Sequence, residues 1–386
     1  MKDNGRLAIE GGEPVSKRLI PIAKPMISRE AIKDVSEVLR SGYLRQGAKT
    51  IEFEERFKER VGARYAYAVN SGTAALHVAY LSILRPGDEV IAPSFTFIAT
   101  SSTIIFSGGK PIFADIDEET LTLDPEDVKE KITSKTRAIA PVHLFGNAAD
   151  MKALSEIAED HALFLVNDAA QAHGTEIDGK DVGSFDHLNC YSFYPTKTIT
   201  TGEGGMVTTN DEELHRKGCL IRSHGETSRY LHTMLGLNYR MTDITATIGL
   251  NQLKRLDEFL EKRRKNAEAL TRGLERIPGL KPQKPGPGVN HSYSYYSIVM
   301  DLEMFKCSRD RFVEALQAEN IECSVHYPTP LHKQPVFKDL SRESRCPISE
   351  DISKRIFSIP VHPALNHEDL EKILEALDKV SSHYSR

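Results

Sequence analysis

Short apolar runs alternate along the first half of the chain with segments that have helical spacing. The runs are EVIAPSF (89–95), KPIFADID (110–117), RAIAPVHLFG (137–146) and ALFLVNDAA (162–170). Runs of this length that are rich in Val and Ile predict strands buried on both faces. PEDVKEKI and MKALSEIAEDH lie between them and have the spacing of amphipathic helices. This alternation predicts an α/β fold with a mostly parallel central sheet, in which ligands bind beyond the carboxyl ends of the strands.

The pattern changes near Asp243. The segment DITATIGLNQLKRLDEFLEKRRKNAEALTRGLERI (243–277) predicts one long amphipathic helix, with an apolar face formed by Ile244, Ile248, Leu253, Leu256 and Leu260. PGLKPQKPGPG (278–288) then breaks the pattern, and strands and helices mix after it. We therefore expect a large domain over residues 1–250 and a smaller C-terminal α/β domain over residues 251–386.

Composition and charge exclude several classes of protein. The 386 residues are 40% hydrophobic and 27% charged, which is enough for two packed units. A net charge of -5 gives no basic footprint for nucleic acid or an anionic membrane surface. We find no apolar run of about 18 residues, no apolar signal core near the N-terminus, and no CxxC pair among five scattered cysteines. We expect a cytoplasmic protein with reduced thiols that binds neither nucleic acid nor membrane.

Three strand ends carry candidate site residues. Asp168 ends ALFLVND, and by itself it is better explained as a helix N-cap than as a carboxylate that holds a ring nitrogen. Asn-Ser-Gly-Thr, with Gly72 and Thr73, opens a helix whose free N–H groups could cap the helix or bind phosphate. Phe97 in SFTFIAT could lie on a ring, although a core position is the commoner place for Phe.

A single lysine in YSFYPTKTITTGEGG joins these sites. Lys197, if it is buried beside a cofactor, would have a lowered pKa and a nucleophilic amine, and Ser192 could reach a phosphate. A pyridoxal phosphate site needs such a lysine, a carboxylate for the ring nitrogen, a phosphate cup and a stacking face. The chain offers one candidate for each, in order along one domain. The glycines after the lysine would let the backbone turn sharply beside the ring.

With these blocks in view, the sequence resembles the DegT/StrS-type sugar aminotransferases, which are pyridoxal-phosphate enzymes of the aspartate aminotransferase fold (fold type I). The resemblance covers nearly the whole chain, from IPIAKPMISREAIKDVSEVLRSGYLRQG through NSGTAALH, PSFTFIAT, DAAQAHG and YSFYPTKTITTGEGGMVTTND to FSIPVHPALNHEDLEKI. It implies pyridoxal 5'-phosphate as the cofactor.

The resemblance also implies roles for residues in the matching blocks. It assigns Lys197 to the aldimine and to acid–base catalysis, and Asp168 to the pyridinium nitrogen. It assigns the other cofactor contacts to Gln171 near the ring hydroxyl, Phe97 on the ring face, and Gly72, Thr73 and Ser192 at the phosphate. Asn238 in GLNYRM would reach the phosphate of a neighbouring subunit, which implies a homodimer with shared active sites. Tyr43, His326 and Tyr327 lie in blocks that line the sugar site in such enzymes, although an ordinary loop role fits them as well.

The implied reaction is a ping-pong transamination through the Lys197 aldimine. Glutamate or glutamine would donate the amino group, and a 4-keto or 3-keto deoxysugar linked to a nucleotide would accept it, in the biosynthesis of amino sugars and polysaccharides. An inosose-type carbocyclic ketone stays open as the acceptor. A sugar dehydratase of the same fold would have histidine in place of Lys197, and a non-catalytic ligand sensor would leave the full set of catalytic groups unexplained.

No metal site is expected. His143, His173 and His187 show no HExxH or comparable spacing. Asp115 and Asp117 stand at the end of a predicted strand, and we expect a turn after the strand there and not a metal pair.

Overall fold

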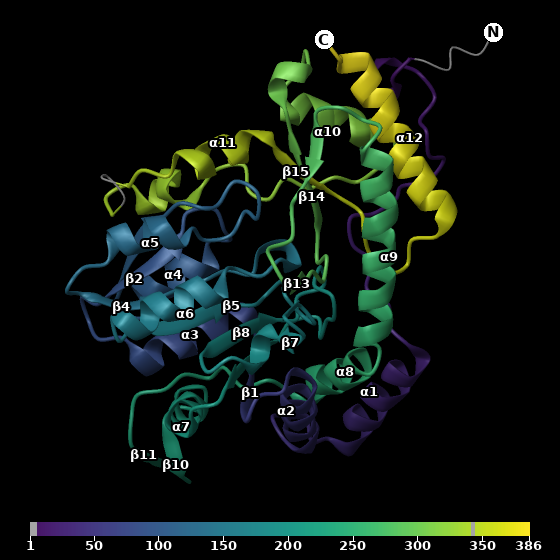
Figure 1. Ribbon diagram of the computed structural model, residues 1–386. Coiled ribbons are helices and arrows are strands. Elements are labelled where there is room, and N and C mark those ends of the chain that lie inside the picture. The colour runs from purple at the N-terminus through teal and green to yellow at the C-terminus, as the bar shows by residue number, and fades with distance from the viewer. Residues whose placement is uncertain (1–5, 341–343) are drawn as a thin grey trace.

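The computed structural model describes residues 6–340 and 344–386. Its largest sheet has the strand order β1 (Tyr65–Val69), β9 (Gly205–Thr209), β8 (Leu188–Ser192), β5 (Phe164–Asp168), β4 (Thr136–Ile139), β2 (Glu89–Pro93) and β3 (Lys110–Ala114). Neighbours from β8 to β3 pair in parallel, whereas β9 runs antiparallel to β1 and β8. The predicted mostly parallel sheet is therefore confirmed (Figure 1).

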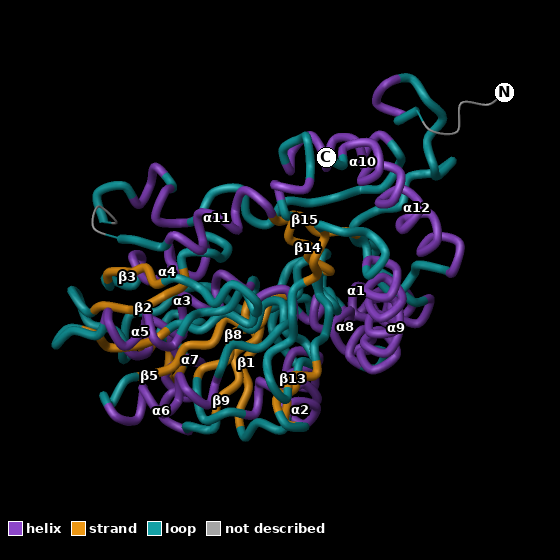
Figure 2. Tube along the Cα trace, turned by 45° about the horizontal axis from the view of Figure 1, so that its top comes forward, coloured by secondary structure: helices purple, strands orange, loops and turns teal. Residues whose placement is uncertain are grey.

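Helices cover both faces of this sheet. Successive apolar side chains of a buried strand point to opposite faces, so each face needs a covering layer. Val90 and Ala92 share a core with helices α3 (Gly72–Ile83), α4 (Ala99–Phe106) and α7 (Glu212–Ile221). Ile91, between them, packs with helices α5 (Pro125–Lys131) and α6 (Met151–Asp160). The result is a three-layer unit, which Figure 2 shows with the orange strands enclosed by purple helices.

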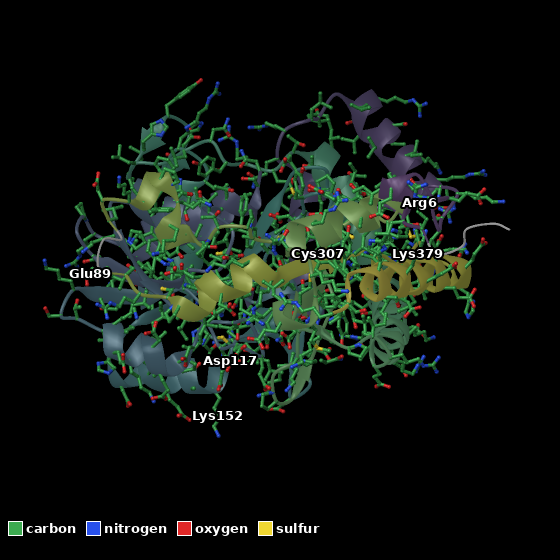
Figure 3. The ribbon with its side chains drawn as sticks, turned by 90° about the horizontal axis from the view of Figure 1, so that it is seen from above. Arg6, Glu89, Asp117, Lys152, Cys307 and Lys379 are labelled. Atoms are coloured by element: carbon green, nitrogen blue, oxygen red, sulfur yellow. The ribbon has the colours of Figure 1, made fainter. Side chains whose placement is uncertain are left out.

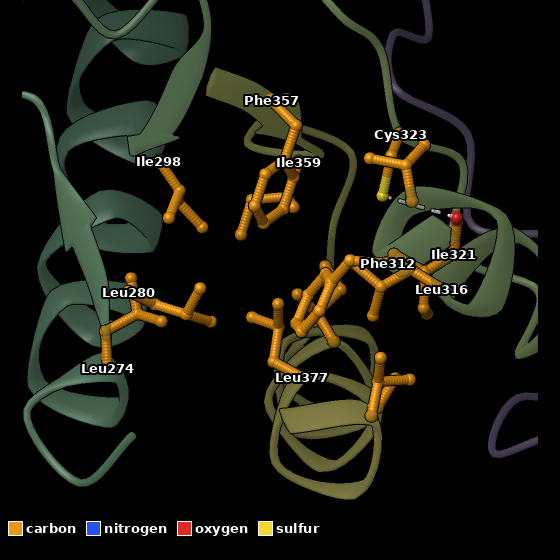
Figure 4. Packing of buried hydrophobic residues seen from close by; sticks show 14 of the residues in the cluster. Leu274, Leu280, Ile298, Phe312, Leu316, Ile321, Cys323, Phe357, Ile359 and Leu377 are labelled. Atoms are coloured by element: carbon orange, nitrogen blue, oxygen red, sulfur yellow. Dashed lines mark hydrogen bonds between the residues drawn. The ribbon is translucent and has the colours of Figure 1, made fainter. Parts of the chain in front are cut away.

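A smaller antiparallel sheet forms the second core. Its strands are β12 (Leu280–Pro282), β14 (Tyr296–Met300) and β15 (Ile356–Ile359). Helices α10 (Arg309–Ala318) and α12 (His367–Tyr384) pack on it, and Figure 4 shows Phe312 and Leu377 from these helices facing Ile298 and Phe357. The remaining elements are α1 (Arg29–Ser41), α2 (Ala48–Val61), β6 (Glu176–Ile177), β7 (Lys180–Asp181), β10 (Glu226–Ser228), β11 (Leu231–His232), β13 (Val289–Asn290) and α11 (Pro347–Arg355).

The single long helix predicted over 243–277 is wrong in one respect. The segment forms two helices, α8 (Asp243–Leu253) and α9 (Leu256–Leu274), with a break at Lys254 and Arg255. Helix α8 packs on α1 and α2, whereas α9 runs on to the small sheet. One straight helix could not pack on both surfaces. The predicted apolar face is also divided, since Leu256 and Leu260 are buried while Ile244 and Ile248 are only half-buried.

Two segments link the two cores. Leu7 and Ile20, from the start of the chain, are buried in the core of the small sheet. Leu331, Phe337 and Cys346 instead return to the large sheet and pack with Phe113. Helix α11 follows this return and lies over the large unit in both Figure 1 and Figure 2. The boundary at residue 250 stays a prediction.

None of the helices in residues 6–340 and 344–386 has the length and apolar character needed to cross a membrane.

Candidate active site

A cavity of about 460 Å³ opens at the carboxyl ends of β5 and β8, where the fold predicts a ligand site. Nine of the eleven residues predicted from the sequence line it: Gly72, Thr73, Phe97, Asp168, Gln171, Ser192, Lys197, His326 and Tyr327. The last two come from the C-terminal part of the chain, after β14. The structure thus brings together groups that are far apart in the sequence, while their individual roles stay predictions.

Lys197 stands in the loop that leaves β8 and returns as β9. Its backbone N–H donates to the Tyr194 carbonyl at 2.9 Å, and the Thr201 N–H donates to the Phe193 carbonyl at 3.0 Å, which closes the loop on itself. Gly202 has φ +83°, a conformation that disfavours a side chain. The half-buried amine loses hydration, which lowers the pKa of Lys197 to about 8 although Asp168 acts in the opposite direction.

This lowered pKa predicts an unusual reactivity for Lys197. In the cofactor-free protein, acylation of Lys197 by acetic anhydride should rise to half its maximum near pH 8, because only the neutral amine reacts. The exposed Lys152 is the control, and the pH profile of its acylation should differ from that of Lys197. Peptide mass spectrometry measures both sites in one sample. Identical pH profiles would contradict the assigned environment of Lys197.

Asp168 is a buried carboxylate at the end of β5. Its Oδ2 accepts a hydrogen bond from the Thr100 hydroxyl at 2.7 Å, and its Oδ1 accepts one from the Ala170 N–H at 3.1 Å. Burial raises the pKa of Asp168, while these two donors and Lys197 lower it. No helix follows Asp168, so the N-cap explanation is wrong.

The N-terminus of α3 forms one end of the cavity. Ser71 caps the helix by accepting the Ala74 N–H at 3.1 Å, and Gly72 and Thr73 line the cavity beside Ser192. A Cβ on Gly72 would lie 2.5 Å from the Ser192 Cβ, so only glycine allows this approach. The Ser71 cap does not exclude an anion site here, because the other N–H groups of the first turn have no partner within the helix.

Aromatic and amide groups form the opposite wall. The Phe97 ring is 55% exposed and lies 6.2 Å from the Tyr327 ring, so a core position for Phe97 is wrong. Gln171 accepts the Phe145 N–H at 2.7 Å and donates to the Tyr327 hydroxyl at 3.3 Å. His326 lies 4.5 Å from the Tyr295 ring, and burial, followed by Lys197, lowers the pKa of His326 to about 4.

Two predicted residues lie outside the cavity. Asn238 is exposed and follows the β10–β11 hairpin, where its backbone bridges to Ser223. Tyr43 is 81% exposed between α1 and α2.

The sequence did not single out several residues that line the cavity or support it. They are Thr96, Thr100, Tyr194, Thr196 and Tyr295. Glu203 of the glycine-rich loop, for which a solvated loop charge is the default expectation, also lines the cavity. Thr100 carried a usable signal, since it stands three residues after Phe97 at the spacing of one helical turn. Tyr295 carried none, because only the docking of the C-terminal unit brings it near Lys197.

The described residues contain no group of three or more His, Cys, Asp or Glu side chains that could hold a metal ion. Asp115 accepts the Ile348 and Ser349 N–H groups at the start of α11, both at 2.8 Å. Asp117, labelled in Figure 3, accepts the Thr120 N–H at 2.7 Å within a turn. Both aspartates therefore have structural partners.

The residues of the cavity fit pyridoxal phosphate. The close approach of Gly72 to Ser192 leaves a compact N–H and hydroxyl cradle for a phosphate, and Asp168 still has lone pairs for a ring nitrogen. An amine of lowered pKa and an exposed aromatic ring stand beside them. On this architecture such a combination is typical of the pyridoxal-phosphate-dependent aminotransferases of fold type I, and the protein is an enzyme of that class.

Comparison with known proteins identifies the family within this class of aminotransferases. The chain belongs to the DegT/DnrJ/EryC1/StrS aminotransferase family, whose pattern matches residues 25–378. It is 37% identical to the spore coat polysaccharide biosynthesis protein SpsC of Bacillus subtilis over 94% of this chain and 98% of SpsC. It is 35% identical to the GDP-perosamine synthase of Vibrio cholerae over 93% of this chain and 98% of the synthase.

A solved structure gives the same result. PseC of Helicobacter pylori, an aminotransferase involved in the biosynthesis of pseudoaminic acid, superposes with a TM-score of 0.90 at 30% sequence identity. The match covers 95% of this chain and 100% of PseC. The predicted family, fold, cofactor and class of enzyme are thereby confirmed.

Proposed function

We propose that this protein transfers an amino group from glutamate or glutamine to a 4-keto or 3-keto deoxysugar linked to a nucleoside diphosphate, by a ping-pong reaction. The observation that carries the proposal is the presence of Lys197 and Asp168 in one cavity, on a chain of this aminotransferase family. The names of two relatives support the choice of acceptor. GDP-perosamine synthase is named after a nucleotide sugar, and SpsC is named as a protein of polysaccharide biosynthesis.

Each residue then has a defined task. Pyridoxal phosphate, when bound, supplies an electron-accepting ring that stabilises negative charge at the substrate Cα. Lys197 holds the cofactor. Once displaced, its amine takes the proton from the Cα of the amino-acid donor and, in the second half-reaction, gives a proton to the sugar carbon that receives the amino group. Asp168 holds the ring N–H as a carboxylate. Phe97 covers one face of the ring and limits the access of water.

The remaining contacts fix the position of the ligands. Gly72, Thr73 and Ser192 bind the phosphate through N–H and hydroxyl groups. Gln171 lies beside the ring hydroxyl. His326 and Tyr327, on the C-terminal wall of the cavity, contact the sugar.

We also propose a homodimer with shared active sites. The surface of the single chain exposes large apolar side chains, among them Phe106, Tyr230 and Leu235, and Leu235 is 95% exposed. Asn238 and Tyr43 are outside the cavity of their own chain, where they could contact that of a partner. A sedimentation mass near twice the 43.1 kDa of one chain is expected, and a monomeric mass would contradict this part of the proposal.

Spectroscopy tests the reaction in two halves. Glutamate or glutamine should convert the visible absorption band of the reconstituted protein into that of the amine form of the cofactor. Keto sugars linked to GDP, UDP or TDP should then restore the original band. If neither amino acid changes the band, the aminotransferase proposal fails. Restoration by an inosose alone would replace the sugar with a carbocyclic acceptor.

A further inference from the structure

Two buried threonines connect to Asp168 by hydrogen bonds: Thr96, which lines the cavity, and Thr100, which does not. The Thr100 hydroxyl donates to Asp168 Oδ2 at 2.7 Å, and the Thr96 and Thr100 hydroxyl oxygens are 3.3 Å apart. Because the hydrogen of Thr100 points to the carboxylate, Thr96 must donate in the second bond. Thr100 is fully buried and Thr96 is 2% exposed, so water cannot replace either donor readily.

These donors fix the Asp168 carboxylate before any ligand binds. Thr100 contacts Oδ2 and the Ala170 N–H contacts Oδ1, so each oxygen has one protein donor. The backbone of Asp168 is fixed as well, since its N–H donates to the Pro141 carbonyl at 2.8 Å and its carbonyl accepts the His143 N–H at 3.0 Å. An ionised carboxylate has about four acceptor sites, so lone pairs remain for a ring N–H in the cavity.

The charge of Asp168 depends on the same donors. Burial disfavours the carboxylate, and the Thr100 hydroxyl is the first of the groups that oppose this effect, ahead of Ala170 and Lys197. The other titratable groups that face Asp168 are Cys190, Tyr80 and Tyr327, and burial raises the pKa of each, which keeps them neutral. A protonated Asp168 would lose the charge that holds a protonated ring nitrogen.

The fold places Thr100 by holding its segment at both ends. Ser94 directly follows β2. Its hydroxyl lies 2.5 Å from His332 Nδ1, and its backbone carbonyl accepts the Leu331 N–H at 2.7 Å. At the other end, the Thr100 N–H donates to the Phe97 carbonyl at 3.2 Å in the first turn of α4. One short segment therefore presents both the aromatic ring of Phe97 and the donor to Asp168.

We propose that Thr100, supported by Thr96, is a positioning residue that keeps Asp168 ionised and oriented toward the ring nitrogen of the cofactor. The inference rests on the proposed role of Asp168 and adds the group that sets its charge. Thr100 touches neither the cofactor nor the substrate and acts through Asp168 alone.

Carbon-13 NMR of the cofactor-free protein, labelled at its aspartate carboxyls, tests the first part. Thr100→Val keeps the shape of the side chain and removes the donor. The titration of Asp168 should move up by about one to two pH units, as expected for a lost hydrogen bond to a charged group. Thr100→Ser restores the hydroxyl and should bring the titration back. An unchanged titration in a folded Thr100→Val protein would overturn the proposal.

The reconstituted protein gives a second readout through pyridoxal phosphate labelled with nitrogen-15 in the ring. Thr100→Val should move the nitrogen resonance toward that of the unprotonated ring, as the proton shifts to Asp168. If Thr100→Val does not fold, Thr96→Val decides the question, because it weakens the same donor and should cause a smaller shift in the same direction. No shift would overturn the role of Thr100. An unprotonated ring in the wild-type protein would instead overturn the role of Asp168.

Discussion

Replacing Lys197 with alanine should lower the rate of transamination by about 10⁴-fold or more, because the variant loses both the covalent attachment of the cofactor and the base that removes the Cα proton. The cavity should persist, since the loop of Lys197 is held by backbone hydrogen bonds that the substitution leaves in place. Single-turnover absorbance with glutamate or glutamine measures the loss directly. Added methylamine should restore part of the proton transfer if the missing group is the amine.

Lys152→Ala is the matched control, because Lys152 is exposed on α6 and does not line the cavity. Figure 3 shows its side chain at the edge of the molecule. It should keep full activity. Turnover by Lys197→Ala at a rate near that of the control would rule out Lys197 as the catalytic amine.

The same variant tests whether the sites are shared. Mixing inactive Lys197→Ala with an impaired Asn238→Ala under conditions that exchange subunits should restore about a quarter of the wild-type activity, since half of the dimers are mixed and each has one intact site. Without any recovery, Asn238 would not serve a neighbouring subunit.

Asp168→Asn should have the second-largest effect, a fall in kcat of about 10² to 10³-fold, which is typical of the loss of one preorganised electrostatic contact. The amide has nearly the same shape, and its oxygen can still accept the Thr100 hydroxyl. It cannot supply the charge that holds the ring nitrogen protonated. Steady-state kinetics should show the loss mainly in kcat, with the absorption spectrum changed as well.

Asp160→Asn is the control for that substitution, because Asp160 is an exposed aspartate at the end of α6. It should match the wild type in kcat and spectrum. A wild-type kcat for Asp168→Asn would show that the ring nitrogen needs no carboxylate here.

The break between α8 and α9 illustrates what a local pattern can predict. The apolar spacing over 243–277 is helical on both sides of Lys254, so the prediction of helix was sound. The turn at Arg255 depends on two separate surfaces that the two helices cover. The apolar spacing within the segment does not predict these surfaces. Phe97 is similar, since its exposure follows from the cavity that opens beside it and not from its neighbours in the sequence.

The sequence by itself determined the parallel strands and the blocks that carry Lys197, Asp168 and Gly72, because buried strands and sharp turns depend on residues that are close in the chain. Tertiary structure alone decided which distant groups meet: Thr100 with Asp168, and Tyr295 with His326. It also shifted the pKa values of Lys197 and Asp168. Loss of hydration lowers the pKa of Lys197 and raises that of Asp168, and burial exists only once both units have packed around the cavity.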